Sequence, residues 1–483
     1  MLLSKHARAD FSSVTLPQDA KHCIGSYSRV LWKNKALLCT LCCIIYMSVF
    51  TGVYTIASAW NLPRGSPLVI RGFHETKMTK VMFVATSEMC MSYLLHVFTR
   101  FSRHELRLTL KTLPSLDPLN RTRDITDEFP CSQSWDKLQT ISQNDTEDIM
   151  CIPRPKYMSP LKNPCYMEET KPGARKSNTV HCLPYFHILG NDKCGTTDFH
   201  ARLTQHPRVL PNNGGIGKEI YYWCWLRYGL WMKRRVPKKR FHIYHMFFQV
   251  PTNLIMNEYR KNKVQYITGD GTPMDFWDFR GWPEDPQNAG LSEPRFLTPH
   301  AMRHVYHDPR FIVMVRNPID RLYSDYIFLG YGFTAKKFAQ DVPIAISMIR
   351  ECLRVNTTRQ CFFSDFMYHQ LPMRIHISCY SVYLREWLSV FHKNHFLVLR
   401  TEDYHADMKG TLQRAYTFLG VRNLTEEEEV KIESQMKKHE TVLKKKAGPM
   451  FPETRALLKE FFSAFNEDLA SLLGDTRFLW NDR

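Results

Sequence analysis

A short polar loop between an apolar run and an amphipathic run holds the first residues that could do chemistry. It reads HILGNDKCGTTDFHARL, with Lys193 and Gly195 just ahead of Thr196 and Thr197. Where a strand turns into a helix, free backbone N–H groups and the helix dipole bind anions, and a lysine adds a mobile positive charge. The spacing therefore predicts an anion site. The alternative is an ordinary strand-to-helix turn with Thr196 as the N-cap.

The position of the lysine separates this loop from that of ATP- and GTP-hydrolysing proteins. A Walker A loop has its lysine directly before the serine or threonine that ligates magnesium, whereas Lys193 precedes the last glycine. Metal-dependent nucleotide chemistry is therefore disfavoured. One feature supports the opposite interpretation, because VQYITGD ends an apolar run at Asp270 as a Walker B strand would. A P-loop kinase or NTPase remains an alternative.

A second candidate group follows another apolar run. In FIVMVRNPIDRLYSDYIF, Arg316 comes directly after the run and Ser324 follows about two helical turns later. If the run is a strand of a parallel sheet, its carboxyl end lies where doubly wound proteins bind ligands. A guanidinium there favours bidentate binding of a phosphate. The alternative is an arginine that pairs with a neighbouring carboxylate.

Two more charged segments lie between these motifs. KEIYYW, from Lys218 to Trp223, places the carboxylate of Glu219 beside bulky aromatic residues. Glu219 is a candidate base, and the alternative is a simple ion pair with Lys218 or Arg227. WMKRRVPKKRFHIYH is strongly basic. It suits nucleic acid in a cytosolic protein and an acidic polysaccharide in a lumenal one, or it is a solvated helix end.

Alternating strands and helices would position these groups. Short apolar runs predict buried strands, and longer amphipathic runs between them predict helices. Such alternation is typical of a parallel sheet with helices on both faces, so the predicted fold class is α/β. The strands are expected at Tyr185–Leu189, Gln265–Thr268, Phe311–Val315 and Phe396–Leu399, and helices at Thr196–Gln205, Ile319–Tyr326 and Tyr380–Phe391.

The whole chain points to a membrane-anchored protein with an acidic partner. Its 483 residues carry a formal net charge of +18, which suits nucleic acid, anionic lipid or an acidic polysaccharide. Residues 36–60 are uncharged and long enough to span a bilayer as one helix. Basic residues are more frequent just before this stretch than just after it, so residues 1–35 are expected in the cytosol and the rest in a lumen. The weaker apolar stretch 81–98 contains Glu88 and His96 and is interpreted as stem or as an amphipathic helix.

Composition divides the lumenal part into a stem and a domain. Residues 61–176 lack clear periodicity and predict a stem, and 177–483 predict the folded domain. A lumen makes N-glycosylation sequons usable and permits disulfides among the 14 cysteines, of which Cys165 with Cys182 and Cys352 with Cys361 are the favoured pairs. No cysteine or histidine spacing indicates a metal site. The sequons start at Asn120, Asn144, Asn356 and Asn423.

Taken together, the loop around Gly195 and the segment from Arg316 to Ser324 resemble the 5′-phosphosulfate loop and the 3′-phosphate site of the Golgi carbohydrate sulfotransferases. These enzymes use 3′-phosphoadenosine 5′-phosphosulfate, PAPS, without a metal. KEIYYW, SCYSVYLREWLSVFHKNHFLVLRTEDY and LKKKAGPMFPET are similar to further segments of that family. Ser378 stands where the family usually has glycine, and Ile220-Tyr221 where it usually has a pair such as Pro-His, so the acceptor specificity could differ.

The resemblance implies a PAPS-dependent sulfotransferase fold and a role for each motif. The implied catalytic residues are Lys193, at the leaving oxygen, and Glu219, as the base. The implied donor-binding residues are Lys193, Cys194, Gly195, Thr196, Thr197, Arg316, Ser324, Lys445, Lys446 and Gly448. The implied acceptor-binding residues are Lys218, Trp223 and Tyr380. The lysine run at 444–446 has a solvated surface as its alternative.

The resemblance also implies a function. It predicts a single-pass type II Golgi membrane protein that transfers the sulfuryl group of PAPS to a hydroxyl, at C6, of N-acetylgalactosamine 4-sulfate in chondroitin or dermatan sulfate. The expected partners are a sulfated glycosaminoglycan and a membrane, with no nucleic acid, and a homodimer is kept beside a monomer. A glycosaminoglycan-binding membrane protein without catalysis and a P-loop kinase or NTPase are the alternatives.

Overall fold

The computed structural model describes residues 124–132, 144–168, 179–232, 234–434 and 446–481. All of them belong to one compact unit of the chain. The predicted tail and anchor, residues 1–60, lie outside the described residues, and so does Lys445. Within the described ranges no helix combines the length and hydropathy that crossing a bilayer requires.

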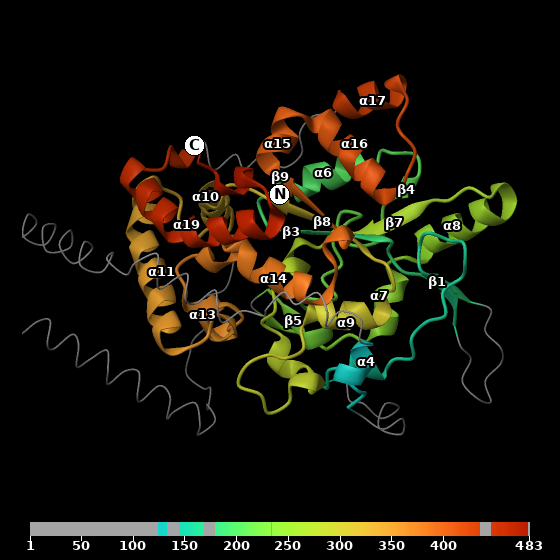
Figure 1. Ribbon diagram of the computed structural model, residues 1–483, viewed down its shortest axis with the longest axis horizontal. Helices are drawn as coiled ribbons and strands as arrows, with labels where there is room; N and C mark the ends of the chain where they lie inside the picture. Colours follow the sequence, from blue (N-terminus) through green and yellow to red (C-terminus); the bar gives the residue numbers. More distant parts are fainter. Residues whose placement is uncertain (1–123, 133–143, 169–178, 233, 435–445, 482–483) are drawn as a thin grey trace, which may run out of the picture. The chain divides into compact units, whose positions relative to one another are not determined.

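Five parallel strands form the central sheet, in the spatial order β4-β7-β3-β8-β9 (Figure 1). The chain starts this sheet in the middle with β3, adds β4 and β7 on one side, and then adds β8 and β9 on the other. The carboxyl ends of β3 and β8 therefore flank the point where the strand order reverses, which is the usual ligand position in open α/β sheets. The strands are β3 (Phe186–Gly190), β4 (Val209–Leu210), β7 (Ile267–Asp270), β8 (Arg310–Val315) and β9 (Phe396–Arg400).

Helices cover both faces of the sheet because alternate strand residues point to opposite faces. In β8, Phe311, Val313 and Val315 pack into the larger core with α9, α10, α14 and α19, and Ile312 and Met314 pack into the smaller core with α6 and α16. The helices are α4 (Ile125–Glu128), α6 (Thr196–Leu203), α7 (Phe241–Met246), α8 (Gln249–Asn262), α9 (Thr298–Val305), α10 (Pro318–Phe328), α11 (Ala335–Val355), α12 (Thr358–Phe362), α13 (Asp365–Gln370), α14 (Tyr380–Val390), α15 (Thr401–Ala406), α16 (Met408–Leu419), α17 (Glu426–Glu433) and α19 (Pro452–Leu473).

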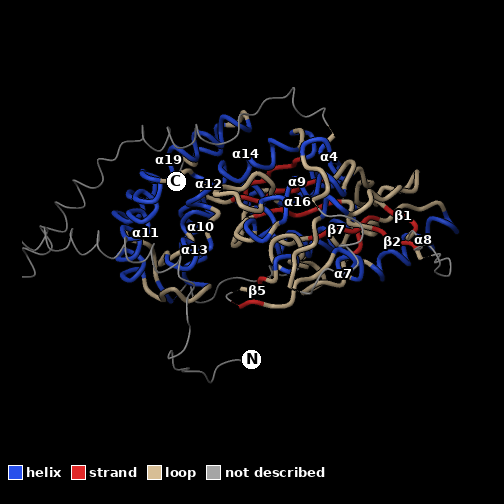
Figure 2. Tube along the Cα trace, turned by 90° about the horizontal axis from the view of Figure 1, so that it is seen from below, coloured by secondary structure: helices blue, strands red, loops and turns tan. Residues whose placement is uncertain are grey.

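Two small hairpins and a group of helices extend the sheet region. β1 (Cys165–Met167) pairs with β2 (Val180–Cys182), and β5 (Leu230–Trp231) pairs with β6 (Arg234–Arg235), both antiparallel. Figures 1 and 2 show the helices α10, α11 and α13 gathered at one end of the sheet, with β1 and α8 at the other.

The predicted α/β class with a parallel sheet is confirmed, but one strand is displaced. The sequence predicts Gln265–Thr268, whereas β7 begins at Ile267, where pairing with Val209 of β4 starts. The side chain of Gln265 instead accepts a hydrogen bond from Lys162 N (2.8 Å) and donates to Pro160 O (3.0 Å). β4 itself is only two residues long, which is too short for a recognisable pattern.

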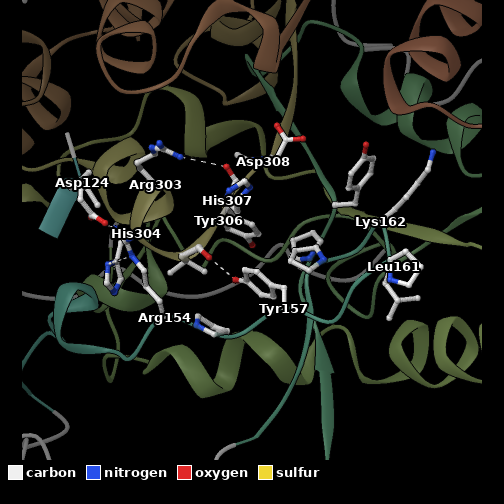
Figure 3. A pocket seen from close by; sticks show the side chains of 18 residues that line it. Asp124, Arg154, Tyr157, Leu161, Lys162, Arg303, His304, Tyr306, His307 and Asp308 are labelled. Carbon is white, nitrogen blue, oxygen red and sulfur yellow. Dashed lines mark hydrogen bonds and ion pairs between the residues drawn. The ribbon is translucent and has the colours of Figure 1, made fainter. Parts of the chain in front are cut away.

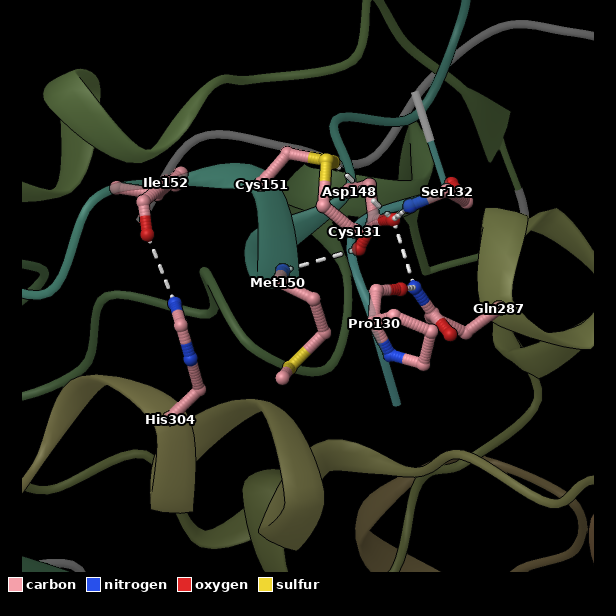
Figure 4. Close-up of a disulfide and its surroundings, with 9 residues drawn as sticks. All are labelled: Pro130, Cys131, Ser132, Asp148, Met150, Cys151, Ile152, Gln287 and His304. Atoms are coloured by element: carbon pink, nitrogen blue, oxygen red, sulfur yellow. Dashed lines mark hydrogen bonds between the residues drawn. A yellow bond between two sulfur atoms is a disulfide. The ribbon is translucent and has the colours of Figure 1, made fainter. Parts of the chain in front are cut away.

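Parts of the region predicted as a stem are attached to the domain (Figure 4). Cys131 and Cys151 form a disulfide, and the buried carboxylate of Asp148 accepts hydrogen bonds from Ser132 N (3.0 Å) and Gln287 Nε2 (2.8 Å). A buried carboxylate needs such donors to offset the loss of water. Ordered packing thus begins well before residue 177. Polar contacts, a disulfide and a few core side chains such as Phe129 and Ile149 hold this region. These few apolar residues are too scattered to give the sequence an apolar periodicity.

The predicted disulfides are both present. Cys165 is bonded to Cys182, which joins β1 to β2, and Cys352 is bonded to Cys361 between α11 and α12. The Cys131–Cys151 disulfide was not predicted from the sequence.

Candidate active site

The anion loop leaves β3 at Gly190 and enters α6 at Thr196. Lys193 and Gly195 both have a left-handed backbone, with φ of 67° and 82°, and the turn is closed by a hydrogen bond from Cys194 N to Asn191 O (3.2 Å). The N-cap of α6 is Gly195, which has no side chain to bond the first N–H groups. Thr196 is therefore not the cap, and the helix start presents its N–H groups as an anion site does.

Arg316 reaches this loop from the next strand. Its Nη1 donates to the carbonyl oxygen of Lys193 (3.3 Å), since β3 and β8 are adjacent parallel strands that end at the same edge. Tyr380 Oη in turn donates to the Arg316 carbonyl (2.8 Å). The two motifs that the sequence singled out therefore meet at one edge of the sheet.

Thr401 joins the same two loops and was not predicted from the sequence. Its hydroxyl lies 2.7 Å from the carbonyl oxygen of Cys194 and 3.0 Å from that of Val315, within donating distance of both. Thr401 directly follows β9, the strand beside β8. A hydroxyl residue two positions after the predicted strand Phe396–Leu399 was the available signal.

Lys193 is held over an aromatic ring beside buried acids. Its Nζ lies 3.6 Å from the ring centroid of Phe328, and burial lowers the pKa of Lys193 while Asp325 and Asp192 oppose that shift. Phe328 ends α10, the helix that follows Arg316. The ammonium group is thus partly shielded from water, which strengthens its attraction for a bound anion.

A network of buried charged side chains holds Asp192 of the anion loop in place. Arg374 bonds both carboxylate oxygens of Asp325 and lies 3.7 Å from Asp192 Oδ1. Trp277 Nε1 donates to the other Asp192 oxygen (3.0 Å), and Arg321 Nη1 lies 3.4 Å from Asp325. Burial raises the pKa of Asp192 and Arg374 opposes the rise. These charges fix the loop residue that precedes Lys193.

Lys218 and Glu219 connect the loop to a third segment. Lys218 is fully buried, and its Nζ lies 2.6 Å from Glu219 Oε1 and 3.2 Å from Thr196 Oγ1. Tyr221 Oη donates to the other carboxylate oxygen of Glu219. The ion pair of Glu219 with Lys218 is therefore present, whereas Arg227 pairs with Asp285 (2.5 Å). Because Lys218 also contacts Thr196, the carboxylate sits beside the anion loop.

Ser324 and the C-terminal loop meet on α10. Ser324 is 4% exposed, and the residue before it, Tyr323, donates from its hydroxyl to the Gly448 carbonyl (2.8 Å). Gly448 has a left-handed φ of 79°, and Lys446 is exposed nearby in the chain. Of the predicted donor-binding residues, Ser324 and Gly448 are thus brought to one helix.

Two predicted acceptor residues lie in the core instead. Trp223 is 0% exposed and packs against Phe241 and Tyr244 at centroid distances of 5.9 and 5.5 Å. Tyr380 is 1% exposed. Neither ring has a free face for a sugar in this structure, and the hydroxyl of Tyr380 positions Arg316 instead. The segment has no regular period, so the sequence could not tell buried from exposed aromatics.

Asp270, on which the kinase alternative rests, accepts hydrogen bonds from groups within the protein. It is 1% exposed and accepts hydrogen bonds from Thr272 N (3.1 Å), Thr272 Oγ1 (2.7 Å) and Tyr244 Oη (2.9 Å). Burial raises the pKa of Asp270 to about 6. The carboxylate that resembles a Walker B residue is therefore engaged by protein donors. In the described part of the chain no group of three or more His, Cys, Asp or Glu side chains could hold a metal ion.

Cavities lie on two sides of the sheet. One of about 290 Å³ adjoins the anion loop and is lined by Thr197, Gly217 and Lys218 among others. A larger one of about 830 Å³ is lined by Tyr185 and Pro309, which precede β3 and β8. Figure 3 shows Tyr157 of this larger cavity between Arg154 and Lys162. It lies at the amino ends of the strands and is separate from the loop.

A parallel α/β sheet with an anion loop and an arginine at adjacent strand ends defines a class of proteins that bind phosphate-bearing ligands. Comparison with known proteins narrows this class. Residues 184–456, more than half of the chain, match the family described as sulfotransferase domain, and the chain belongs to this family. The family prediction from the sequence is confirmed.

Individual relatives agree with this family. The chain is 32% identical to carbohydrate sulfotransferase 15 of Homo sapiens over 312 residues, 62% of this chain and 55% of that protein. It thus spans about half the length of this curated relative. It is 25% identical to bifunctional heparan sulfate N-deacetylase/N-sulfotransferase 2 of Bos taurus over 346 residues, 66% of this chain and 33% of that protein. A solved sulfotransferase from Alicyclobacillus acidocaldarius aligns with a TM-score of 0.37 and 18% identity, over 61% of this chain and 96% of that one.

Proposed function

We propose that this protein transfers the sulfuryl group of PAPS to a hydroxyl of a carbohydrate. The observation that carries the proposal is the hydrogen bond from Arg316 Nη1 to the Lys193 carbonyl (3.3 Å). It brings the arginine expected to bind the 3′-phosphate within reach of the loop expected to bind the 5′-phosphosulfate. The 32% identity to carbohydrate sulfotransferase 15 supports a carbohydrate as the acceptor.

The residues present fit a doubly anionic nucleotide. The start of α6, whose N-cap Gly195 has no side chain, offers N–H groups to one anionic end, and Lys193 adds a partly desolvated cation. Arg316 and Ser324 serve the other anionic end, and Gly448, whose carbonyl oxygen accepts a hydrogen bond from Tyr323 of α10, closes over it together with Lys446. Cys194 contributes its backbone, because burial raises the pKa of its thiol to about 12 and keeps the sulfur protonated.

Transfer of a sulfuryl group requires a base for the acceptor hydroxyl and a cation near the leaving oxygen. Glu219 is half-buried, and hydrogen bonds from Lys218 and Tyr221 fix both of its oxygens. Lys218 also contacts Thr196 in the loop. We assign proton acceptance to Glu219, orientation of that carboxylate to Lys218, and charge stabilisation to Lys193.

The proposed acceptor is C6 of N-acetylgalactosamine 4-sulfate in chondroitin or dermatan sulfate. The proposed setting is the Golgi lumen, with residues 36–60 as a type II anchor. Three disulfides within the described residues suit an oxidising compartment. The sequon residues Asn144, Asn356 and Asn423 are all exposed, as glycosylation requires.

The test incubates the detergent-solubilised full-length protein with sulfur-labelled PAPS and a panel of desulfated chondroitin, chondroitin 4-sulfate, dermatan sulfate and heparan sulfate. Disaccharide analysis is expected to find new sulfate at C6 of 4-sulfated units. Transfer to heparan sulfate alone would overturn the acceptor but keep the reaction. Binding of chondroitin without any transfer would identify a non-catalytic glycan-binding protein, and magnesium-dependent ATP turnover would identify a kinase or NTPase.

A further inference from the structure

An aromatic cluster lies next to the candidate base. The rings of Tyr221 and Trp225 are stacked with centroids 5.0 Å apart and an angle of 11°. Trp231 of β5 meets both rings edge-on, at 5.3 and 5.6 Å. Trp225 is buried and anchored by its Nε1 to Asp278 Oδ2 (2.7 Å). Tyr221 and Trp231 are only half-buried, so they present the exposed part of the cluster.

Tyr221 ties this cluster to the reacting groups. Its hydroxyl donates to Glu219, and its backbone is left-handed, with φ of 61°. A tyrosine adopts that conformation only where its surroundings impose it, and such residues gather at functional sites. Here Tyr221 N lies 3.1 Å from Thr272 Oγ1, which holds the backbone in place. The ring therefore has one fixed orientation beside the carboxylate.

Arg234 lies on the same face of the β5–β6 hairpin as Trp231. In the β5–β6 hairpin, Trp231 and Arg234 are directly opposite partners, so their side chains lie on one face. Arg235 and Lys238 on this hairpin and its continuation pair with Glu284, at 3.2 and 2.8 Å. Arg234 is exposed, and the described residues include no ion partner for it. Its charge stays open to a ligand.

We propose that Tyr221, Trp231 and Arg234 form the subsite that selects the acceptor sugar. The C–H face of a pyranose ring packs against Tyr221 and Trp231, which places a hydroxyl of that sugar toward Glu219. Arg234 binds an anionic substituent of the acceptor, a sulfate or a carboxylate. The inference rests on the proposed function and replaces the sequence-based expectation for Trp223 by residues that have an exposed surface.

The first arm of the test measures binding without turnover. Full-length protein is titrated with a chondroitin 4-sulfate hexasaccharide, and separately with the product nucleotide 3′-phosphoadenosine 5′-phosphate. Trp231→Ala and Arg234→Gln are each expected to weaken hexasaccharide affinity about tenfold and to leave nucleotide affinity unchanged. Trp231→Phe is expected to restore most of the affinity. Arg234→Gln also lowers the dependence of binding on salt.

Two control variants remove an aromatic ring and an arginine at exposed positions outside the proposed subsite. Phe366→Ala on α13 deletes an aromatic ring that is 67% exposed, and Arg260→Gln on α8 deletes an exposed arginine. Both are expected to bind the hexasaccharide as the unaltered protein does. Equal affinities for Trp231→Ala, Arg234→Gln and the controls would overturn the subsite. If Trp231→Ala does not fold, Arg234→Gln, compared with Arg260→Gln, decides the result.

The second arm separates the subsite from the proposed reaction. In labelled transfer assays Arg234→Gln is expected to raise the KM for 4-sulfated chondroitin about tenfold, with the KM for PAPS unchanged. A protein that transfers sulfate but shows no change in either variant would refute the subsite alone. A protein that transfers no sulfate, yet loses hexasaccharide affinity in both variants, would refute the proposed function and support the subsite.

Discussion

Replacing Arg374 with methionine tests the buried charges beneath the anion loop. Its side chain is 5% exposed and bonds both oxygens of Asp325, which is 0% exposed. Removing one member of a buried ion pair costs about 3–5 kcal/mol, because the remaining charge loses its partner in a poorly solvated place. Arg321 stays 3.4 Å from Asp325. We therefore expect the lower end, a loss of about 3 kcal/mol in the free energy of unfolding.

Urea unfolding followed by tryptophan fluorescence measures this loss. The double variant Arg374→Met/Asp325→Asn removes one charge of each sign and is expected to recover about half of it. Arg354→Met is the matched control, since Arg354 and Glu351 form an ion pair with both side chains more than half exposed, and it is expected to change stability by less than about 0.5 kcal/mol. Nucleotide affinity should fall in Arg374→Met as well, because Asp192 in the loop loses its nearest cation.

Two results would refute this reasoning. One is an unfolding free energy of Arg374→Met that equals that of the control. The other is a double variant whose losses simply add, which would mean that Arg374 and Asp325 do not act as a pair.

Three further predictions concern the loop, the fold and the attached segment. Lys193→Ala should lower kcat about 10²–10³-fold with a smaller change in nucleotide affinity, and unchanged single-turnover rates would exclude Lys193 from the chemistry. Asp270 binds its proton more tightly in the folded than in the unfolded state, because burial raises its pKa to about 6, so stability should fall by about 3 kcal/mol between pH 4 and 6 and stay level above. Asp270→Asn should remove the fall in stability between pH 4 and 6, and sulfate transfer by this variant should not depend on magnesium. A fall in stability equal to that of the native protein would contradict the raised pKa of Asp270. Asp148→Ala removes the acceptor of the buried Met150 N and of the part-buried Ser132 N and Gln287 Nε2 and should cost about 1–3 kcal/mol, with faster hydrogen exchange at residues 144–152, whereas protection equal to the native protein would show that this segment is held by other contacts.

The proposed donor-binding part of the site can be predicted from the sequence because each of its motifs is a short continuous segment. The loop at Lys193 and the run that ends at Arg316 are each short patterns attached to one strand, and parallel pairing brings strand ends together without further information. The acceptor half is not local in this sense. Trp223 and Tyr221 are two residues apart in a segment without a regular period, and only the fold decides that one is buried and the other half-exposed.

Long-range polar contacts escape sequence reasoning for a related reason. Arg374 and Asp325 are 49 residues apart, and nothing in either neighbourhood marks them as partners. The same holds for Asp148 and Gln287, separated by 139 residues. Hydrophobic periodicity reports which face of an element is buried, but it does not report which buried charges compensate one another.

The two sides of the proposed reaction meet at Thr196. The hydroxyl of Thr196 lies 3.2 Å from Lys218 Nζ, which contacts Glu219, whose second oxygen is held by Tyr221. A chain of polar contacts thus runs from the first residue of α6 to the half-exposed ring of Tyr221. Lys218 is buried between these two groups, and under the proposed function it sets the spacing between donor and acceptor. The proposed function therefore requires the sugar to lie on the segment that follows Glu219, which gives one physical reason why the KE pair is adjacent to the aromatic residues in the sequence.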